Sequence, residues 1–588
     1  MRPTTQRIRL PRGSIPASKT QIRDSFCPRQ FSHKPPKLIL VSTRASTRPQ
    51  LPFLHPSGSY VSSAQLSRLF SISASQKKFI KDTARDSVKW TLIFGTVSVS
   101  FSLAGYAILT ERQERAFPSP HEWSFITRFR FRRGKWWQVP ENNEKPGATN
   151  WPQVYEEMLK AVERLEDVNK DGAGIVEQDQ EEGGLLVPGV GKAGYDVTAK
   201  SEEWRQGYWE ALMGLALAAE NQDGWVTTAS QKYYWSPAYV PTPQNPYPPD
   251  VLPGGIPLPP EEERIPAAGP PETFYMKLLT TKGFTTSQRV RAALGCAHWL
   301  TFKELTDSAE EMYRWALDIA ISGLPTPDKS SVIDSKTGVL SSTASKEHIT
   351  PNLIFAATEL ATFHASQGNT TAALPILVSL LRARLEAPEA PATEPPKRQE
   401  KSMISEFINL LVEPVYPPLP PTGDEPFLRI DTDRCEEAAL KTYIGEILFA
   451  TAGPTSYTLQ TAKTPGLSWV RDSVSTAKQA QSIPGIQAEV PRRRRCETCE
   501  EVGLEAWGKI MTYLAAQAKE DLEGVKRGWG PRALAYKLLW GTDALEARIE
   551  DLEEEEDGVA MRLHKLRVKV HREETAEHRR KYARTFVF

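Results

Sequence analysis

Cysteine and long apolar runs are both scarce in this chain of 588 residues. Five cysteines are too few for a small scaffold held together by disulfides. The mean hydropathy of −0.43 excludes a transporter with many membrane spans, because each span needs about 20 apolar residues. Hydrophobic residues make up 40% and charged residues 25% of the chain, as in ordinary globular proteins.

Motifs of catalysis are also lacking. A phosphate-binding P-loop needs Gly, four residues, and then Gly-Lys followed by Ser or Thr; Gly191-Lys192 is the nearest fragment, with Leu186 and Ala193 at the other required positions. The patterns His-Glu-x-x-His and Gly-x-Ser-x-Gly do not occur. We therefore expect no catalytic residues, no cofactor, no metal ligands and no enzymatic activity.

Acidic residues are rare at the amino terminus. Residues 1–89 hold 17 Lys or Arg and three Asp, a net charge of +14, whereas the remainder carries −13. Through residue 76 the chain has 12 basic residues, one acid and many Ser and Thr, which is typical of a mitochondrial transit peptide. The alternative is a disordered basic tail that binds nucleic acid.

The segment from residue 68 to 73 resembles the fungal matrix-processing pattern of Arg, a spacer, an aromatic and a small residue. Cleavage would follow Phe70, and the processing residues would be Arg68, Phe70 and Ser71. The prediction is therefore a transit peptide over residues 1–70 and a short matrix segment over residues 71–89.

One stretch, residues 90–110, contains no charge and is bounded by Lys89 and Glu111. At about 1.5 Å per residue such a helix crosses a hydrocarbon core of about 30 Å. It predicts a single transmembrane helix, the alternative being a buried core helix. A transit peptide followed by a stop-transfer transmembrane helix leaves the amino terminus in the matrix. We therefore expect the bulk of the chain in the intermembrane space.

Aromatic and basic residues are mixed in the juxtamembrane segment 111–149. Aromatic rings suit the headgroup depth of a membrane and guanidinium groups bind lipid phosphate. The alternative is a strand or helix packed on the soluble domain; nucleic-acid binding is disfavoured because that domain is acidic. The candidate membrane-interface residues are Trp123, Phe125, Arg128, Arg130, Arg132, Arg133, Trp136 and Trp137.

Helical stretches alternate with proline-rich breaks over residues 150–541. Residues 237–271 contain 13 prolines and residues 388–421 contain nine, which predicts extended, poorly ordered loops. The clearest helical stretch resembles a tetratricopeptide repeat, with large and small residues at fixed spacings on two helices and a glycine between them. Its repeat positions are Leu360, Ala361, His364, Gly368, Ala373 and Leu377, with Leu380 large where the pattern prefers a small residue.

A second copy keeps the same spacings around a turn about two residues longer. Its positions are Leu294, Gly295, Ala309, Tyr313 and Ala316. Three looser copies are residues 209–221 with Trp225 and Ala229, residues 444–448 with 469–481, and residues 502–519 with 531–540. One repeat cannot bury its own face, so several must stack. The predicted fold is all-α, a degenerate tetratricopeptide-repeat α-solenoid preceded by one transmembrane helix; a generic helical bundle is the alternative.

Cys496 and Cys499 form a single Cys-x-x-Cys without the second pair that a structural zinc site needs. We interpret them as small packing residues on one helical turn, with reversible oxidation as the alternative, and expect residues 492–495 to form an exposed loop.

Residues 542–588 predict a charged terminal helix that caps the repeats, or else a partner-binding tail. His564, His571 and His578 recur every seven residues on this helix and are interpreted as a solvated stripe.

The order of these parts, with the strip Pro118-Ser119-Pro120-His121-Glu122-Trp123-Ser124-Phe125 after the span, resembles the fungal tetratricopeptide-containing adaptor subunit of the mitochondrial inner-membrane i-AAA protease. The resemblance implies a non-enzymatic adaptor that binds unfolded or misfolded proteins and delivers them to the protease for quality control. Its partners would be i-AAA protease subunits and unfolded substrates, with no nucleic acid. A respiratory-complex assembly factor with the same layout is the alternative function.

Overall fold

The computed structural model describes residues 73–143, 148–178, 194–230, 232–243, 245–249, 251–252, 255–391, 416–451, 465–527 and 541–585. The predicted transit peptide, with Arg68, Phe70 and Ser71, lies outside the described residues, as do residues 531–540. The chain divides into two compact units, Met1–Thr96 and Val97–Phe588, with the boundary inside helix α2 (Ala74–Ala116). In the first unit the described residues consist of Ser73 and the amino-terminal part of α2.

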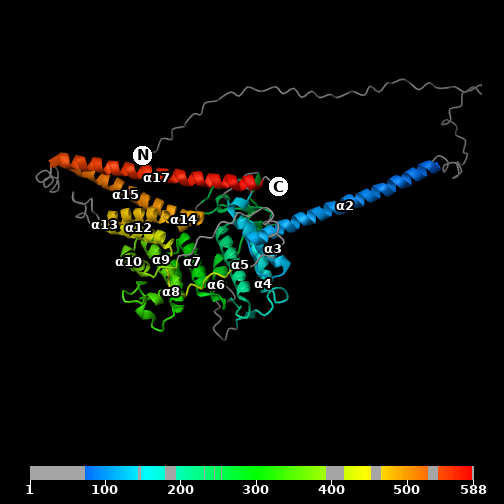
Figure 1. The fold of residues 1–588 in the computed structure, drawn as a ribbon, viewed down its shortest axis with the longest axis horizontal. Coiled ribbons are helices and arrows are strands. Elements are labelled where there is room, and N and C mark those ends of the chain that lie inside the picture. The colour runs from blue at the N-terminus through cyan, green and yellow to red at the C-terminus, as the bar shows by residue number, and fades with distance from the viewer. Residues whose placement is uncertain are drawn as a thin grey trace, which may run out of the picture. The chain divides into compact units, whose positions relative to one another are not determined.

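The second unit is mostly helical, and successive helices pack against their neighbours in chain order (Figure 1). In the carboxyl-terminal part of the unit, helix α15 packs against three other helices, α12, α13 and α17. The predicted predominance of helices is confirmed, although short strands are also present. The helices that follow α2 are α3 (Phe125–Gln138), α4 (Trp151–Glu166), α5 (Glu202–Asn221), α6 (Pro271–Thr280), α7 (Thr286–Phe302), α8 (Thr306–Ser322), α9 (Pro351–Ser366), α10 (Thr370–Glu386), α12 (Asp433–Thr451), α13 (Pro465–Gln481), α14 (Pro484–Ala488), α15 (Val490–Arg527) and α17 (Gly541–Thr585).

Short antiparallel strands interrupt the helices between α4 and α6. A two-stranded sheet pairs β1 (Val176–Glu177) with β2 (Tyr195–Asp196), a three-stranded sheet has the order β4-β3-β7, and a second two-stranded sheet pairs β5 with β6. Their remaining members are β3 (Val226–Thr227), β4 (Tyr234–Trp235), β5 (Val251–Leu252), β6 (Ile256–Pro257) and β7 (Ile265–Pro266). The proline-rich segment 237–271 therefore contains strands and 3-10 turns rather than only an extended loop.

The position of strand β3 shows that one predicted repeat, the copy over residues 209–221 with Trp225 and Ala229, is wrong. Trp225 and Ala229 were expected on a second helix after α5, but Trp225 directly precedes β3. Gly224 turns the chain with a φ of +74°, and the β-branched residues that follow it favour a strand. Helix α5 instead packs against α4 and α6.

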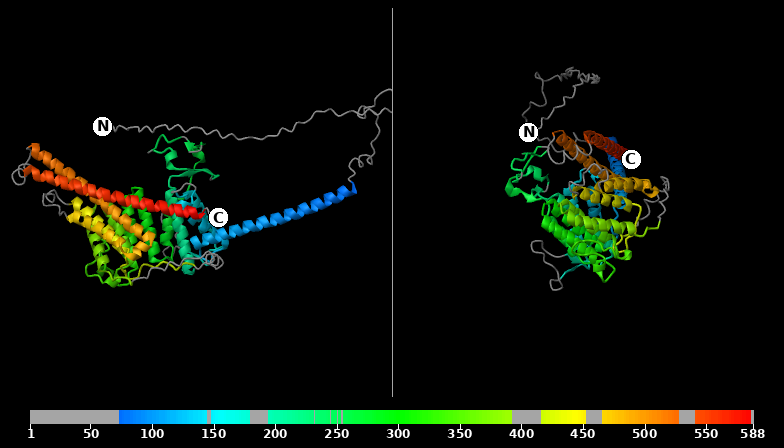
Figure 2. Two further views of the ribbon diagram at one scale, coloured as in Figure 1. Left: turned by 45° about the horizontal axis from the view of Figure 1, so that its top comes forward. Right: turned by 90° about the vertical axis from the view of Figure 1, so that its left-hand side faces the viewer.

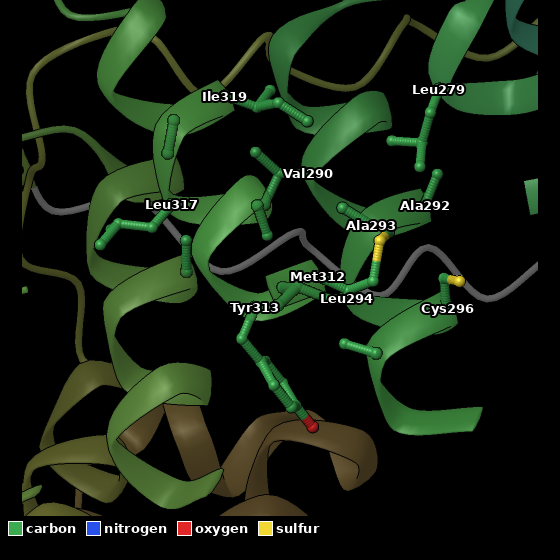
Figure 3. Packing of buried hydrophobic residues seen from close by; sticks show 14 of the residues in the cluster. Leu279, Val290, Ala292, Ala293, Leu294, Cys296, Met312, Tyr313, Leu317 and Ile319 are labelled. Carbon is green, nitrogen blue, oxygen red and sulfur yellow. The ribbon is translucent and has the colours of Figure 1, made fainter. Parts of the chain in front are cut away.

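Alanines and large apolar side chains form the core of α6–α8 (Figure 3). Val290, Ala293 and Ala297 of α7 and Ala316 of α8 are fully buried. Small side chains let two helix backbones approach closely, and the larger side chains fill the remaining space to near-crystalline density. A capping box starts α7, because the Thr285 hydroxyl accepts from the Gln288 N–H and the Gln288 side chain accepts from the Thr285 N–H.

A long helical hairpin ends the unit: α17 lies alongside α15 in both figures that show the whole chain (Figures 1 and 2). The predicted loop at residues 492–495 is wrong, since these arginines belong to the first turns of α15. Arg493 pairs with Glu573 of α17 at 2.7 Å, and Arg494 lies 3.6 Å from Glu574 of the same helix, so a helix distant in the chain supplies counter-charges for two of these four arginines. The predicted terminal helix is confirmed.

Candidate membrane anchor and partner-binding face

Helix α2 has the length and composition to cross a membrane. Its most apolar window of 18 residues has a mean hydropathy of 1.8, and none of that window is buried in the protein. The hydroxyl of Thr96 donates to the Leu92 carbonyl at 2.8 Å, so this polar group is satisfied inside the helix. The predicted span, residues 90–110, lies within α2, which continues to Ala116.

A buried ion pair joins the last turn of α2 to α3. Glu114 accepts hydrogen bonds from the backbone N–H and the hydroxyl of Ser119, at 3.0 and 2.8 Å. It also pairs with Arg132, and with Arg128 at 3.1 Å. Glu114 and Arg132 are both buried, and buried charges are tolerated only when paired and hydrogen-bonded. This arrangement holds the carboxyl end of α2 in a fixed position against α3.

A second set of contacts fixes the start of α3 to the loop after α4. Asp171 accepts from the Ser124 N–H at 2.7 Å and from the Thr127 hydroxyl at 2.5 Å. Arg164 donates to the Thr127 hydroxyl at 2.8 Å. The residues after the candidate span are therefore part of the folded unit.

Several predicted membrane-interface residues face protein instead. Trp123 and Arg132 are buried, and the Trp123 ring packs edge-on against Phe131 with 5.3 Å between ring centroids. Arg130 and Arg133 both pair with Glu157 of α4, at 2.8 and 3.3 Å. For these residues the alternative of a helix packed on the soluble domain holds, because Glu157 of α4 pairs with Arg130 and Arg133, and Glu114 of α2 pairs with Arg132.

Of the four remaining membrane-interface candidates, three contact protein and one is exposed. Arg128 pairs with Glu114, the Trp136 ring contacts Phe117 edge-on at 6.4 Å, and Trp137 packs against the main core. Phe125 differs, since it is 61% exposed and begins α3 beside the exposed Ile126. Membrane contact stays a prediction for Phe125.

The predicted repeat positions on α9 and α10 are buried where the two helices meet. Leu360, Ala361, Ala373 and Leu377 are at most 1% exposed. Gly368 ends the turn with a φ of +75°, a conformation that favours glycine. His364 is also buried, and burial lowers its pKa, as expected for a core histidine.

The positions of the second copy lie in the same way on α7 and α8. Leu294, Ala309, Tyr313 and Ala316 are buried. A side chain at Gly295 would come within 2.9 Å of the Tyr275 ring, so glycine here permits close contact with α6. Residues 444–448 of the fourth copy lie in α12 and residues 469–481 lie in α13, and these two helices pack against each other. Residues 502–519 of the fifth copy belong to α15, which packs against α17, and the second part of this copy, residues 531–540, lies outside the described residues.

The exposed sides of α5, α7, α9 and α12 carry aromatic, apolar and acidic side chains that we name the first-helix face. His298 of α7 lies 3.0 Å from the Glu359 carboxylate of α9. The hydrogen bond to Glu359 raises the pKa of His298, and the charge of Glu220 of α5 contributes to this rise. Burial is the largest cause of a raised pKa of Tyr443 of α12, to which the charge of Glu359 contributes. Phe355 stands one turn before Glu359 on α9 and is 40% exposed. The face comprises Leu217, Glu220, His298, Phe355, Glu359, Tyr443 and Glu446.

Burial shapes the electrostatics of this face. Burial raises the pKa of Glu220, although its carboxylate accepts a hydrogen bond from the Tyr275 hydroxyl at 2.8 Å. Burial also raises the pKa of Glu446, which the charge of Lys509 opposes. Half-buried carboxylates next to exposed aromatic rings can accept hydrogen bonds from a polypeptide and bury its apolar side chains. The spacing of four residues between Phe355 and Glu359 places both on one side of α9 and is the signal in the sequence that could have indicated this face.

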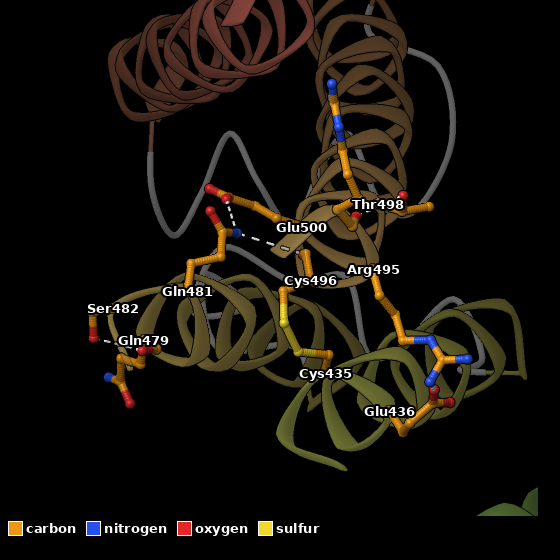
Figure 4. The surroundings of a disulfide bond; sticks show 10 residues. Cys435, Glu436, Gln479, Gln481, Ser482, Arg495, Cys496, Thr498 and Glu500 are labelled. Carbon is orange, nitrogen blue, oxygen red and sulfur yellow. Dashed lines mark hydrogen bonds and ion pairs between the residues drawn. A yellow bond between two sulfur atoms is a disulfide. The ribbon is translucent and has the colours of Figure 1, made fainter. Parts of the chain in front are cut away.

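A disulfide connects α12 to α15 (Figure 4). Cys435 and Cys496, 61 residues apart in the chain, are fully buried, and the Gln481 amide donates to Glu500 at 2.6 Å beside them. The interpretation of Cys496 as a simple packing residue is therefore wrong, whereas Cys499 is a half-buried free thiol whose pKa burial raises to about 11. Sequence spacing gave no sign of Cys435 as a partner.

Among the described residues, no three or more His, Cys, Asp or Glu side chains are grouped as metal ligands would be. The exposed His564 lies on the outer side of α17. No protein-family model matches the chain, and no curated protein or solved structure is significantly similar to it.

Proposed function

We propose that this protein is a non-enzymatic adaptor of the mitochondrial inner membrane, anchored by α2, with tetratricopeptide-like helix pairs that bind unfolded or misfolded proteins and deliver them to the i-AAA protease. The first-helix face is the observation that carries this proposal. Its members come from four helices spread over more than 200 residues, and they bring exposed apolar side chains next to hydrogen-bond acceptors. Such a surface suits varied polypeptide segments better than one small molecule.

Two further features support this proposal. The contacts of Glu114 with α3 would hold the folded unit close to the membrane that contains α2, and thus close to a membrane-embedded protease. Disulfides such as Cys435–Cys496 persist in oxidising compartments and are rare where thiols are kept reduced. This favours the intermembrane space over the matrix for the folded unit.

Capture of an unfolded probe tests the face. The full chain in lipid nanodiscs is titrated with fluorescent, permanently unfolded carboxymethylated α-lactalbumin. Replacing Phe355 and Tyr443 together by Ser should weaken binding at least ten-fold, because these rings supply exposed apolar area. A matched pair, Val378→Ser and Leu385→Ser, changes residues 47% exposed on α10 and should leave binding unchanged. Equal losses in both pairs would remove the face from the proposal.

Delivery is tested in mitochondria. Cross-linking from the full chain should recover protease subunits, and loss of the chain should slow degradation of a protease substrate. Recovery of respiratory-chain subunits instead would favour the assembly-factor alternative.

The orientation in the membrane is tested separately. External protease should digest the folded unit in mitoplasts and not in intact mitochondria; protection in mitoplasts would contradict the proposed orientation.

A further inference from the structure

Residues 416–427 cross the amino-terminal ends of several helices as an extended segment. At one end the Tyr416 side chain is half-buried, and burial together with the charges of Glu210 and Glu203 of α5 raises its pKa. At the other end the Phe427 N–H donates to the Ile349 carbonyl at 2.8 Å, and the Phe427 side chain is buried. The Phe427 end is thereby held in place, and Tyr416 is partly covered by the fold.

The middle of the segment is anchored at Thr422 and Gly423. The Thr422 carbonyl accepts from the Ser287 N–H at 3.2 Å and from the Asn352 amide at 3.0 Å. Gly423 has a φ of +77°, and a side chain there would come within 2.4 Å of the Asn352 amide oxygen. Asp424 accepts from the Thr286 hydroxyl at 2.7 Å. This anchor uses donors at the free amino-terminal ends of α7 and α9.

Between Tyr416 and Thr422 the chain reads Pro417-Pro418-Leu419-Pro420-Pro421, and all five residues are exposed. Proline fixes its own φ near −65° and confines the residue before it to extended conformations. Because four of these five residues are proline, the stretch is covalently restricted to the polyproline II conformation. The prolines have no N–H, so their carbonyls are the only backbone groups with which they can form hydrogen bonds to a partner.

We propose that residues 417–421 are a preformed polyproline ligand for a partner protein whose groove is lined by parallel aromatic rings. Such grooves seat proline rings between aromatic side chains and donate hydrogen bonds to the ligand carbonyls. Affinity benefits because the segment is ordered before binding, so little conformational entropy is lost. The exposed side chain of Leu419 would add an apolar contact between two proline pairs.

The chain contains an internal comparison. Pro257-Leu258-Pro259-Pro260 repeats the tetrapeptide of residues 418–421. There Pro257 belongs to β6, Leu258 and Pro259 are half-buried, and the Pro259 carbonyl accepts from Arg264 at 3.0 Å. The same tetrapeptide is thus partly engaged within the fold at residues 257–260 and exposed at residues 418–421.

The test uses a purified WW domain that binds Pro-Pro-Leu-Pro peptides as the probe, with its groove tryptophan fluorescence as the signal. The full chain in detergent should bind it with a Kd within ten-fold of that of a free peptide covering residues 416–423. Replacing Pro418 and Pro420 together by Ala should weaken binding at least ten-fold. The matched replacement of Pro257 and Pro259 by Ala should leave the Kd unchanged.

Thermal melting of both variants shows whether the fold is retained. Binding of the free peptide without binding of the full chain would overturn the proposal, since residues 417–421 would then be inaccessible. It would equally be overturned if the Pro418 and Pro420 variant melted like the parent and kept full affinity for the probe.

Discussion

Helices α7–α10 and the α15–α17 hairpin are both packed helix against helix, but by different side chains. In α7–α10, buried alanines such as Ala293, Ala316 and Ala373 let backbones approach, and few ion pairs are involved. In the hairpin, α17 presents one buried apolar residue every seven positions, and charges line both sides of this seam. The seam residues are Leu545, Leu552, Val559 and Leu566.

The charges of the hairpin form blocks that pair with each other in the observed antiparallel arrangement. Lys526 and Lys519, late in α15, pair with Glu546 and Glu553, early in α17, at 2.8 and 2.5 Å. Further along, Lys569 of α17 pairs with Glu497 of α15 at 2.8 Å. Shape therefore determines how α7–α10 pack, whereas charge order determines the register of the hairpin. The predictions that follow separate these two modes.

The largest effect is expected from the disulfide that connects α12 to the hairpin. Cys435→Ser should lower the free energy of unfolding by about 2–4 kcal/mol, because the closed loop of 61 residues no longer restricts the unfolded chain. Cys499→Ser, which removes a free thiol, is the control and should melt like the parent. Hydrogen exchange should accelerate in α15 and α17 and stay unchanged in α7–α10; uniform acceleration would show that the two regions are one cooperative unit.

A larger side chain in the core should destabilise helices α7–α10, which pack through close contacts between small and large apolar side chains. Ala373→Leu inserts three carbon atoms where Ala373 is fully buried between α9 and α10, and should cost about 1–3 kcal/mol. Val378→Leu enlarges a residue on the same helix that is 47% exposed and should cost almost nothing. Thermal melting of the two variants measures the difference. An Ala373→Leu chain that melts like the parent would remove the structural basis of the repeat prediction.

Loss of one buried carboxylate should affect the hairpin alone. Glu497 is 1% exposed and lies against Lys569 and Arg493, so Glu497→Gln removes the counter-charge of Lys569 and leaves Arg493 paired with Glu573. The expected cost is about 1.5 kcal/mol, the value of a hydrogen bond to a charged group. Glu523→Gln changes an exposed pair within α15 and serves as the control. Comparable melting of both variants would mean that apolar packing alone holds α17.

The sequence predicted the helix pairs better than it predicted what joins them. Leu360, Ala361, Gly368 and Ala373 follow a local spacing rule, and local rules identify a helix, a turn and a buried stripe. Cys435 could not be found in this way, because its partner lies 61 residues away and only the fold brings them together.

The same limit explains the wrong predictions for arginine. Arg132 looked like a membrane-interface residue because its partner, Glu114, lies on another helix. Arg493 and Arg494 looked like a loop because Glu573 and Glu574, which pair with them, are about 80 residues away. Charged residues are assigned to the surface by default, and only tertiary structure shows which of them are paired inside the protein.

The smallest expected effect concerns the pair of His298 and Glu359, which connects α7 to α9. The hydrogen bond to Glu359 raises the pKa of His298, burial opposes the rise, and the charges of Glu359 and Glu220 add to it. A raised pKa means that folding favours protonated His298. This contribution is therefore fully present below about pH 6.5, the ordinary pKa, and is lost as the pH rises through the raised value. Because the imidazole is half-exposed, the difference should be only about 0.2–1 kcal/mol. Melting temperatures of the parent and of His298→Asn should differ at pH 5.5 and converge by pH 8.5. A difference that stays constant with pH would show that His298 contributes through packing against Tyr313 rather than through charge, and α7–α10 would then be held by shape alone.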